Sequence, residues 1–422
     1  MCLKFIILKT NIKYNSNINE ENKTFFRNES IFLFLKNNLN KDGYFAIGEK
    51  KGFTVQKNAD LDFEKMDSFI SINDEWKFGF LTYDIKNNVE NLESNNSDSL
   101  DFPLLYFFIP KTLLKYKNGT FSLIYGDESL ICEANEFIKK QKTKLTLKLT
   151  PIITKKEYLA HVNSIKKEIK FGNIYEANFC YEYRLENQSI NPFDVYHNLM
   201  PLTNAPFSSF GKFNNKYIIS ASPERFLQKK GNKLISEPIK GTSKRGKDKE
   251  EDLRLKNELV HNEKERSENI MIVDLVRNDL SKIAKFDSVK VEELCKIYSF
   301  ETVHQMISRI TCEEEDNTSF SDIIKATYPM GSMTGAPKVS AMQIIEREEQ
   351  TKRGLYSGSI GYITPSNDFD FNVIIRSFLY NETNKYTSAM VGGAITDKSN
   401  PEEEYSETLT KIEALLKAIN NG

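Results

Sequence analysis

The sequence predicts an α+β fold built on a mainly antiparallel sheet, and three observations support this prediction. Apolar runs of strand length recur along most of the 422 residues. Amphipathic helical stretches lie among them without the regular strand–helix alternation of a parallel sheet, and no internal repeat is visible. The composition includes 29 Phe and 19 Tyr, whose rings bury large areas and supply a substantial core. The length fits one large or two ordinary domains, and the composition excludes long disorder.

In the first 150 residues, the expected elements are strands separated by polar spacers. Apolar clusters or alternations of four to seven residues predict strands at 32–36, 43–48, 78–84 and 104–110. The stretch 87–101 is rich in Asn, Ser and Asp, which predicts a loop.

After residue 154 the chain alternates between helical and strand-like patterns. The first helix is expected over 154–172, because Thr154 suits an N-cap, Glu157 follows three residues later and Gly172 suits a stop. Further helices are expected at 268–284 and 401–420, the latter opening with Pro401. Strands are expected at 175–185, 205–213, 216–227, 232–242, 354–364, 369–380 and 386–396. The heavily charged run 243–268 indicates a solvated helix face or a mobile loop.

Charge and cysteine content predict the compartment. There are 58 Lys and Arg against 59 Asp and Glu, so no basic excess points to nucleic acid. The N-terminal run MCLKFIILKTN is too short for a signal sequence, and no stretch approaches the roughly 20 apolar residues of a membrane span. A cytoplasmic protein with no membrane and no nucleic-acid partner is expected. Five scattered cysteines without a C-x-x-C pair do not predict a zinc site or a disulfide framework: Cys2, Cys132, Cys180, Cys295 and Cys312.

Two acidic pairs share one spacing. Glu265 and Glu268 lie three residues apart before a helical apolar run, and Glu404 and Glu407 repeat that spacing in the terminal helix. Each pair falls on one helix face. If the two faces meet, they offer four carboxylates, the hard ligands that Mg²⁺ prefers. Spacing alone favours two solvent-exposed acidic helix ends, because two glutamates three residues apart are common.

Three other charged residues stand in unusual positions. Lys240 lies between a rigid proline and a permissive glycine in EPIKGT; it could be an ordinary loop lysine or a nucleophile, which requires a neutral amine. Glu224 follows an apolar strand in SASPERF and could be a general acid or a surface carboxylate. Arg376 interrupts an apolar strand pattern, and a buried arginine usually has an anionic partner from the protein or a ligand.

Several familiar site types are not visible. The glycine-rich segments GSMTGAPK and VGGAIT can approach an anion but match neither a P-loop nor a dinucleotide fingerprint. There is no nucleophile elbow of a hydrolase or glutaminase. The histidines show no ligand spacing and are expected to be structural or exposed: His161, His197, His261 and His304.

Taken together and in order, the segments resemble the chorismate-utilising enzymes, which include anthranilate synthase component I and the isochorismate, salicylate and aminodeoxychorismate synthases. The similarity is dense from residue 154 to the end and thinner before it, where GFLTYDIKNNVENL resembles the family's N-terminal signature. The segments that carry it are GNIYEANFCYE, SASPERFL, EPIKGT, NEKERSENIMIVDLVRNDL, ETVHQMIS, YPMGSMTGAPKVSAMQIIE, YSGSIGY, NVIIRSF and GGAITDKSNPEEEYSETLTK.

The resemblance implies a role for each candidate residue. Mg²⁺ would be held by Glu265, Glu268, Glu404 and Glu407 and would clamp the ring carboxylate of chorismate. Glu224 would protonate the departing hydroxyl, and Lys240 would attack the ring and form a covalent adduct that ammonia then displaces. Substrate binding is implied for Arg376, Lys411, Tyr356, Ser332, Thr242 and the backbone of Gly392 and Gly393.

Within the family, EPIKGT is similar to component I of aminodeoxychorismate synthase, whereas anthranilate synthases usually carry Ala at the position of Lys240. Isochorismate and salicylate synthases carry a lysine base where this chain has Glu176, which argues against water addition. Three departures from the family pattern stand out: Glu176 replaces the Gln of most aminating members, Gln305 replaces a pocket histidine, and Ala394 replaces the last glycine of a triple. His304 precedes Gln305, but neighbouring strand residues point to opposite faces.

The family fold would be two large antiparallel sheets packed face to face with helices outside. Residues 1–150 would contribute strands to the same body as the chorismate-binding region 151–422. The implied activity forms 4-amino-4-deoxychorismate, with a glutamine amidotransferase subunit as the ammonia source in a heterodimer. The alternatives are anthranilate synthase component I and a non-catalytic relative that serves as an interaction subunit. No tryptophan-binding motif is clear, so tryptophan control is not predicted.

Overall fold

The computed structural model describes residues 26–57, 59–301 and 303–422, so the N-terminal apolar run and Cys2 lie outside the described residues. The strands are β1 Ile31–Asn37, β2 Asp42–Val55, β3 Lys77–Leu81, β4 Leu105–Lys117, β5 Thr120–Tyr125, β6 Thr150–Pro151, β7 Glu176–Leu185, β8 Phe207–Phe213, β9 Lys216–Ser222, β10 Arg225–Lys230, β11 Lys233–Glu237, β12 Ile239–Lys244, β13 Lys290–Ser299, β14 Val303–Glu313, β15 Gly335–Ala336, β16 Ser359–Ile363, β17 Phe369–Val373, β18 Ser377–Asn381 and β19 Tyr386–Ile395. The α-helices are α1 Phe63–Ile70, α2 Lys86–Val89, α3 Leu130–Lys139, α4 Lys155–Lys170, α5 Pro192–Thr203, α6 Lys249–His261, α7 Glu263–Ser281, α8 Phe320–Thr327, α9 Lys338–Glu348 and α10 Pro401–Ile419, and η4 Gly331–Met333 is a 3₁₀ turn.

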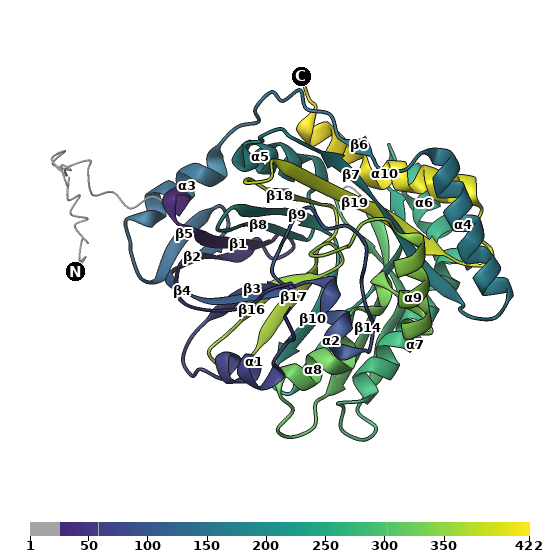
Figure 1. Cartoon of the computed structure of the whole chain (residues 1–422), viewed down its shortest axis with the longest axis horizontal. Coiled ribbons are helices and arrows are strands. Elements are labelled where there is room, and N and C mark those ends of the chain that lie inside the picture. The colour runs from purple at the N-terminus through teal and green to yellow at the C-terminus, as the bar shows by residue number, and fades with distance from the viewer. Residues whose placement is uncertain (1–25, 58, 302) are drawn as a thin grey trace, which may run out of the picture.

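The strands form one hydrogen-bonded network whose ladders are antiparallel. One layer runs in the order β5–β4–β2–β1–β8–β9–β18–β19–β7. The other continues from β4 through β3–β16–β17–β10–β11–β14–β13. Figure 1 shows the two layers, with α4, α5 and α10 covering the first and α1, α7 and α8 lying beside the second. The expected α+β fold of two antiparallel sheets is confirmed, with the addition that β4 belongs to both layers.

Strand β1 shows how the sequence pattern builds the core. Its side chains alternate between two apolar clusters, because successive residues of a strand point to opposite faces. Leu33 and Leu35 belong to the cluster that also contains residues of β3, β16 and α7. Phe32 and Phe34 belong to the cluster that contains residues of α3, α4, α5 and α10. One sheet layer is therefore buried on both faces.

Three expected strands are each divided in two. The expected strand 369–380 is β17 and β18, and Arg376 between them has a φ of 52°, outside the extended region. The expected strands 216–227 and 232–242 break at Pro223 and Pro238, which have no N–H to donate to a ladder. Apolar alternation continues across these breaks, so periodicity alone does not reveal them.

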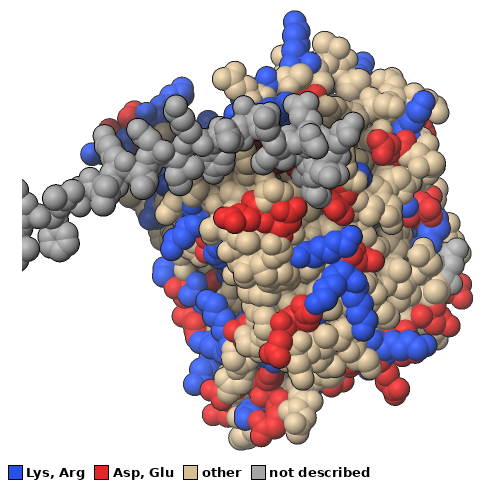
Figure 2. All heavy atoms as spheres, turned by 90° about the vertical axis from the view of Figure 1, so that its left-hand side faces the viewer, with Lys and Arg blue, Asp and Glu red and all other residues tan. Residues whose placement is uncertain are grey.

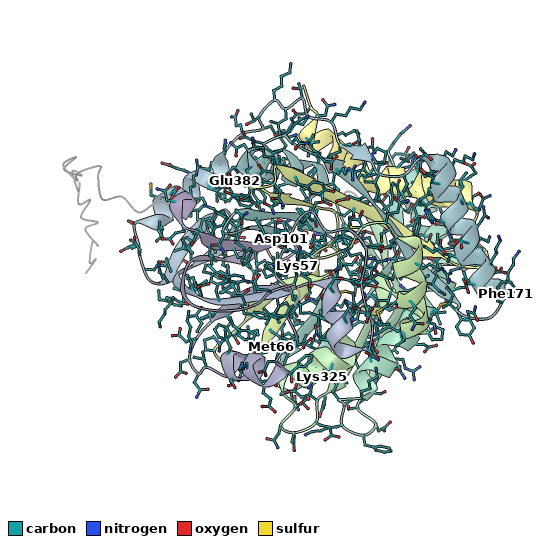
Figure 3. All side chains as sticks on the ribbon, viewed as in Figure 1. Lys57, Met66, Asp101, Phe171, Lys325 and Glu382 are labelled. Carbon is teal, nitrogen blue, oxygen red and sulfur yellow. The ribbon has the colours of Figure 1, made fainter. Side chains whose placement is uncertain are left out.

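The helix expected over 154–172 is α4. Thr154 accepts a hydrogen bond from the Glu157 amide while the Glu157 carboxylate accepts one from the Thr154 amide, and Gly172 has a φ of 83° after the helix end. Phe171 at this end points outward and is 79% exposed (Figure 3). The charged run 243–268 forms α6 and the start of α7, and Leu259 is the buried residue of α6, as a solvated helix face requires.

The polar stretch 87–101 is largely a loop, except that its first residues belong to α2. Lys57, after β2, forms an ion pair of 2.7 Å with Asp101 and a longer one of 3.4 Å with Asp98 (Figure 3). These contacts fasten the end of the loop to the sheet.

The surface and the thiols add two observations. On the face in Figure 2, acidic and basic side chains are interspersed. Among the described residues, no helix is both long and apolar enough to cross a membrane. The described cysteines are free thiols: Cys132, Cys180, Cys295 and Cys312.

Candidate active site

One cavity of about 650 Å³ collects every residue that the sequence analysis placed in a site. Its walls come from segments far apart in the chain, chiefly β12, α7, the η4 turn, β19 and α10. The predicted residues that line it are Glu224, Lys240, Thr242, Glu265, Glu268, Ser332, Tyr356, Arg376, Gly392, Gly393, Glu404, Glu407 and Lys411. The fold therefore brings the two acidic pairs, the lysine and the candidate acid to one place.

The acidic pairs face each other from α7 and α10. Asn262 caps α7 by accepting a hydrogen bond of 3.0 Å from the Glu265 amide, which fixes the first turn. Between the helices lies the ammonium of Lys264, 2.7 Å from Glu404 Oε1 and 3.9 Å from Glu268 Oε1. Within the described ranges, no three ligating side chains already surround a metal position. Lys264 occupies part of the space between the carboxylates.

The donor set nevertheless fits a hard divalent cation. Glu268 Oε1 is buried and has no hydrogen-bond partner among the residues that the structure describes, and a buried oxygen of this kind is satisfied by a cation. Burial raises the pKa of Glu268 to about 7, with the Lys240 ammonium opposing the shift. Burial and the nearby Glu407 carboxylate also raise the pKa of Glu265. A bound Mg²⁺ would favour the ionised form of all these groups.

Lys240 has a buried anionic partner. Its Nζ donates to Glu176 Oε1 at 3.2 Å, and the Glu176 side chain is only 1% exposed. Burial lowers the pKa of the Lys240 ammonium, but the carboxylates of Glu176, Glu268 and Glu224 outweigh it and the net pKa is raised. The surroundings therefore hold Lys240 as an ammonium, contrary to the neutral amine that a nucleophile requires. The expected turn after it is present, since Gly241 has a φ of 88°.

Glu224 lies between β9 and β10 and is 6% exposed. Burial raises the pKa of its carboxyl to about 7, while the nearby Ser332 hydroxyl and the Lys240 ammonium act in the opposite direction. A carboxyl with a pKa near neutrality can donate a proton and take it back at physiological pH. This is the behaviour expected of a general acid, and the surface alternative does not describe this residue.

The opposite wall offers groups for a carboxylate. The Arg376 guanidinium lines the cavity and makes no hydrogen bond or ion pair with any residue that the structure describes. Its surroundings remove water from the guanidinium, and this desolvation lowers its pKa. Lys411 Nζ donates to Gly392 O at 3.0 Å and pairs with Glu407 at 2.6 Å. A Cβ on Gly392 would lie 2.2 Å from Phe179 O, so only glycine allows this close strand pairing. A partly buried guanidinium without a partner among the described residues is suited to an anionic ligand.

The three departures from the family pattern also lie here. Gln305 lines the cavity, and its buried Oε1 has no hydrogen-bond partner within the described part of the chain. His304 points to the other face and lies 2.9 Å from Ser299 Oγ and 3.1 Å from Asp252 Oδ1, so it does not replace the missing pocket histidine. Ala394 lines the cavity, whereas Glu176 stands behind Lys240.

Sequence reasoning missed a buried network behind the pocket. Arg353 donates to Met333 O at 2.5 Å, to Asn178 O at 2.6 Å and to Glu349 at 2.7 Å. Asn178 lines the cavity. The four-residue spacing of Glu349 and Arg353 could have indicated an ion pair, but such pairs are common on helix surfaces and do not indicate a buried network. Lys264 carried no signal beyond its place beside Glu265.

A family model described as chorismate binding enzyme matches residues 31–417. The chain belongs to the chorismate binding enzyme family. One relative is aminodeoxychorismate synthase component 1 of Bacillus subtilis, which is 33% identical to this chorismate binding enzyme over 363 residues. The match covers 81% of this chain and 76% of the relative. Anthranilate synthase component 1 of Aquifex aeolicus is 32% identical over 365 residues, 81% of this chain and 73% of the relative. The crystal structure of anthranilate synthase component I from Streptococcus pneumoniae has the same fold, with a TM-score of 0.77 at 24% identity over 89% of this chain and 92% of that one.

Proposed function

We propose that this chorismate-binding enzyme is component I of an aminodeoxychorismate synthase, which converts chorismate and ammonia to 4-amino-4-deoxychorismate for 4-aminobenzoate and folate synthesis. The observation that carries the proposal is the position of Lys240. It lies in the same cavity as Glu224 and the four candidate metal ligands, so its amine would face a ring bound there. The similarity to the Bacillus subtilis synthase supports this choice.

Substrate binding would divide between two walls. Mg²⁺ held by Glu265, Glu268, Glu404 and Glu407 would supply positive charge for the ring carboxylate. Arg376 offers a guanidinium that has no partner in the described ranges, and Lys411 offers a further cation. Tyr356, Ser332 and Thr242 line the space that remains, with the backbone of Gly392 and Gly393. A dianionic substrate matches a cavity that carries cations at both ends.

The reaction would then proceed by two displacements. The Lys240 ammonium must first lose a proton, and Glu176 is the acceptor in contact with it at 3.2 Å. Glu224 protonates the departing hydroxyl, which leaves as water, while Lys240 Nζ forms a bond to the ring. Ammonia next bonds to the carbon that lost the hydroxyl, and the Lys240 amine departs. The covalent adduct divides one difficult displacement into two easier steps.

The ammonia source would be a glutamine amidotransferase subunit, because no glutaminase motif is present in the sequence. The pair would act in the cytoplasm as a heterodimer. Free ammonium salt should substitute for this partner in a purified assay.

The decisive experiment is product identification by mass spectrometry after incubation with Mg²⁺, chorismate and ammonium salt. The proposal expects 4-amino-4-deoxychorismate. Lys240→Ala should lower kcat on the order of a thousandfold, because the covalent step is lost. Lys233→Ala removes an exposed lysine of the neighbouring strand β11 and should leave kcat unchanged. Undiminished turnover by Lys240→Ala would remove the covalent role.

Anthranilate synthase component I is the second candidate, because the Aquifex aeolicus enzyme is similar over the same share of the chain. Anthranilate as the product would establish it. The non-catalytic alternative rests on Glu176 and Gln305. Calorimetry that shows no chorismate binding in the presence of Mg²⁺ would support that alternative.

A further inference from the structure

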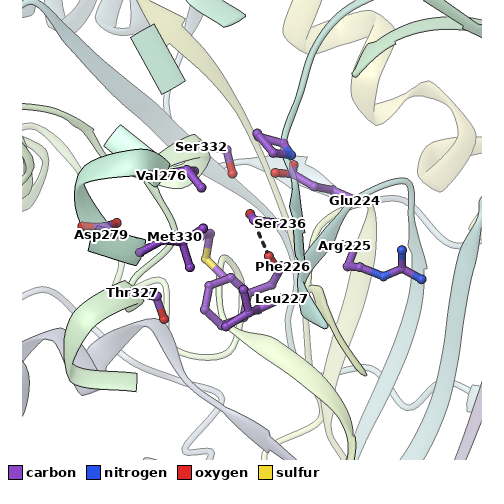
Figure 4. Close-up of a pocket in the computed structure, with 13 residues that line it drawn as sticks. Glu224, Arg225, Phe226, Leu227, Ser236, Val276, Asp279, Thr327, Met330 and Ser332 are labelled. Carbon is purple, nitrogen blue, oxygen red and sulfur yellow. Dashed lines mark hydrogen bonds between the residues drawn. The ribbon is translucent and has the colours of Figure 1, made fainter. Parts of the chain in front are cut away.

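A second, much smaller pocket lies directly behind Glu224. Its volume is about 20 Å³, enough for a single molecule of the size of water, which needs roughly 10–15 Å³. Figure 4 shows it between the strand that follows Glu224 and the helix that carries Val276 and Asp279. It is built from residues of β10, β11, α7, α8 and the η4 turn.

Two residues belong to both spaces. Glu224 and Ser332 line this pocket and also the large cavity. Their oxygens face one another in Figure 4. Ser332 is 6% exposed, and no described residue gives its hydroxyl a hydrogen bond of ordinary geometry. A molecule in the small pocket would therefore stand next to the candidate acid, where the pocket adjoins the large cavity.

The polar groups of the pocket are mainly acceptors. The Ser236 hydroxyl donates its hydrogen to Phe226 O at 3.1 Å, and the Thr327 hydroxyl donates to Ile323 O at 2.7 Å. Each hydroxyl has one hydrogen, so what remains on both oxygens is lone pairs. The Asp279 carboxylate is held by ion pairs to Lys338 and Lys282. The pocket thus favours a molecule with several donors.

The remaining lining is apolar apart from Arg225, whose guanidinium is paired with Glu237 and Asp370. Phe226, Leu227, Val276, Leu280 and Met330 close the pocket. Burying a cation among such side chains is costly, whereas a small neutral molecule pays little. Ammonia has three N–H donors and one acceptor, while water has two of each. The excess of acceptors matches ammonia better than water.

We propose that the pocket behind Glu224 is the ammonia site of this enzyme. The inference rests on the proposed amination. Ammonia held there by Glu224, Ser332 and the acceptor oxygens would lie at the boundary with the cavity in which the ring is proposed to bind, and it would pass these two residues to reach the carbon that loses its hydroxyl.

The proton balance closes within the site. When Glu224 has given its proton to the departing hydroxyl, it is a carboxylate that faces both the ring and the pocket. Ammonia uses its lone pair to form the new C–N bond, and the bond from the ring to Lys240 breaks with its electron pair going to the amine. The product nitrogen then carries one proton in excess, which Glu224 takes. Glu224 is protonated again for the next turnover.

The first test removes an acceptor without changing shape. Thr327→Val should raise the KM for ammonia about fivefold, the effect of one lost hydrogen bond, and leave the KM for chorismate unchanged. Thr82→Val is the matched control: Thr82 is also buried and donates to Leu104 O at 2.7 Å, but it lies outside both spaces. Initial rates are measured against ammonium chloride at saturating chorismate.

The second test fills the pocket. Val276→Ile adds one methyl group beside it and should raise the KM for ammonia about tenfold. Val273→Ile makes the same change at a buried position of α7 that lines neither space, and should match the wild type. Melting temperatures of the four variants confirm that each is folded.

The results separate two failures. If the wild type aminates chorismate while both pocket variants keep the ammonia KM of their controls, the pocket holds only water and the inference is overturned. If a variant unfolds, the other one still decides. If the wild type yields no aminated product, that result contradicts both the proposed function and the ammonia site that depends on it.

Discussion

Lys264 places a positive charge among the carboxylates proposed to hold Mg²⁺. Its ammonium lies 2.7 Å from Glu404 and 3.9 Å from Glu268, and their carboxylates are the main reason why its pKa is raised although burial acts to lower it. Four carboxylates without a cation would repel one another across α7 and α10. Lys264 relieves this repulsion in the metal-free protein, and Mg²⁺ has to compete with it.

Lys264→Met should therefore bind Mg²⁺ more tightly, by roughly fivefold, because one competing ion pair is absent. The metal-free variant should also melt at a lower temperature and gain more from added Mg²⁺ than the wild type does. Calorimetric titration with MgCl₂ and melting curves measure both effects. Lys155→Met removes another lysine that pairs with α10, through Glu402 at 2.6 Å, and is the control. Unchanged or weaker Mg²⁺ binding by Lys264→Met would contradict this account.

The pKa of Glu224, raised by burial to about 7, makes stability depend on pH. The folded state holds the proton more firmly than the unfolded chain, whose carboxyl has its ordinary pKa near 4.5. The stabilising contribution is fully present below pH 4.5 and is lost as the pH rises through about 7. Across this pH range the protein loses on the order of 3 kcal/mol of its free energy of unfolding through this one carboxyl group.

Glu224→Gln has no such proton and should lose less stability than the wild type between pH 5 and pH 8. The measurement is the melting temperature in the presence of a chelator, so that Mg²⁺ does not act on the neighbouring carboxylates. Glu128→Gln, at an exposed position, should follow the wild type. Parallel pH curves for wild type and Glu224→Gln would mean that the carboxyl is not perturbed.

For single residues, the sequence predicts which side chains lie in the cavity better than it predicts their charge states. The spacing of Glu265 and Glu268 places both on one helix face, and the structure has both in the cavity. The ammonium state of Lys240 depends on Glu176, a partner 64 residues away in the chain. No local pattern connects these two, since strand pairing through β15 and β7 brings the segment of Glu176 to the site.

Among the elements, the short strand β12 has to present Lys240 to the cavity and pass close to α7. Gly241 makes both possible. Its φ is 88°, and a Cβ there would lie 3.2 Å from Glu265 Cβ, Glu265 Oε2 and Leu259 Cδ1. The turn from β10 to β11 offers a comparison, because Gly231 has a φ of 61° and no atom of the described residues lies within 4 Å of a Cβ placed there.

Gly241→Ala should destabilise the protein more than Gly231→Ala does. Both substitutions meet the left-handed backbone penalty of about 1 kcal/mol, but only the first pushes on Glu265 and α7. Gly241→Ala should also weaken Mg²⁺ binding severalfold, whereas Gly231→Ala should not. Melting temperature and MgCl₂ titration test this difference. Equal effects of the two variants would show that crowding against α7 is unimportant.

The prediction of helices succeeded where the residues at the start of the helix include a capping residue or a proline. Thr154 and Glu157 mark the start of α4, and Pro401 opens α10, where Asn400 accepts a hydrogen bond from the Glu402 amide. The prediction of strands failed where an apolar alternation runs across a change of direction, as at Arg376 between β17 and β18. The left-handed backbone there is imposed by tertiary packing, which periodicity does not record.

At the scale of the whole molecule, the two sheet layers depend on the N-terminal region. Strand β1 pairs with β8 at seven positions, and β3 pairs with β16 at five. The cluster that contains Leu33 also contains Ile360 and Ile272, so one apolar core draws on both parts of the chain. The two-sheet arrangement itself followed from family resemblance, because strand order cannot be read from a strand-rich pattern.

We propose that residues 1–150 and 151–422 form a single folding unit. Expressed alone, residues 151–422 would expose the edges of β8 and β16 and the apolar faces that β1 to β4 cover, and unpaired strand edges favour aggregation. We expect neither fragment to give a cooperative melting transition, whereas the intact chain gives one. Circular dichroism and size-exclusion chromatography of each fragment, and of the two refolded together, test this. A monomeric 151–422 fragment that melts cooperatively and binds chorismate would show that the N-terminal strands are an appendage and that the catalytic cavity is built without them.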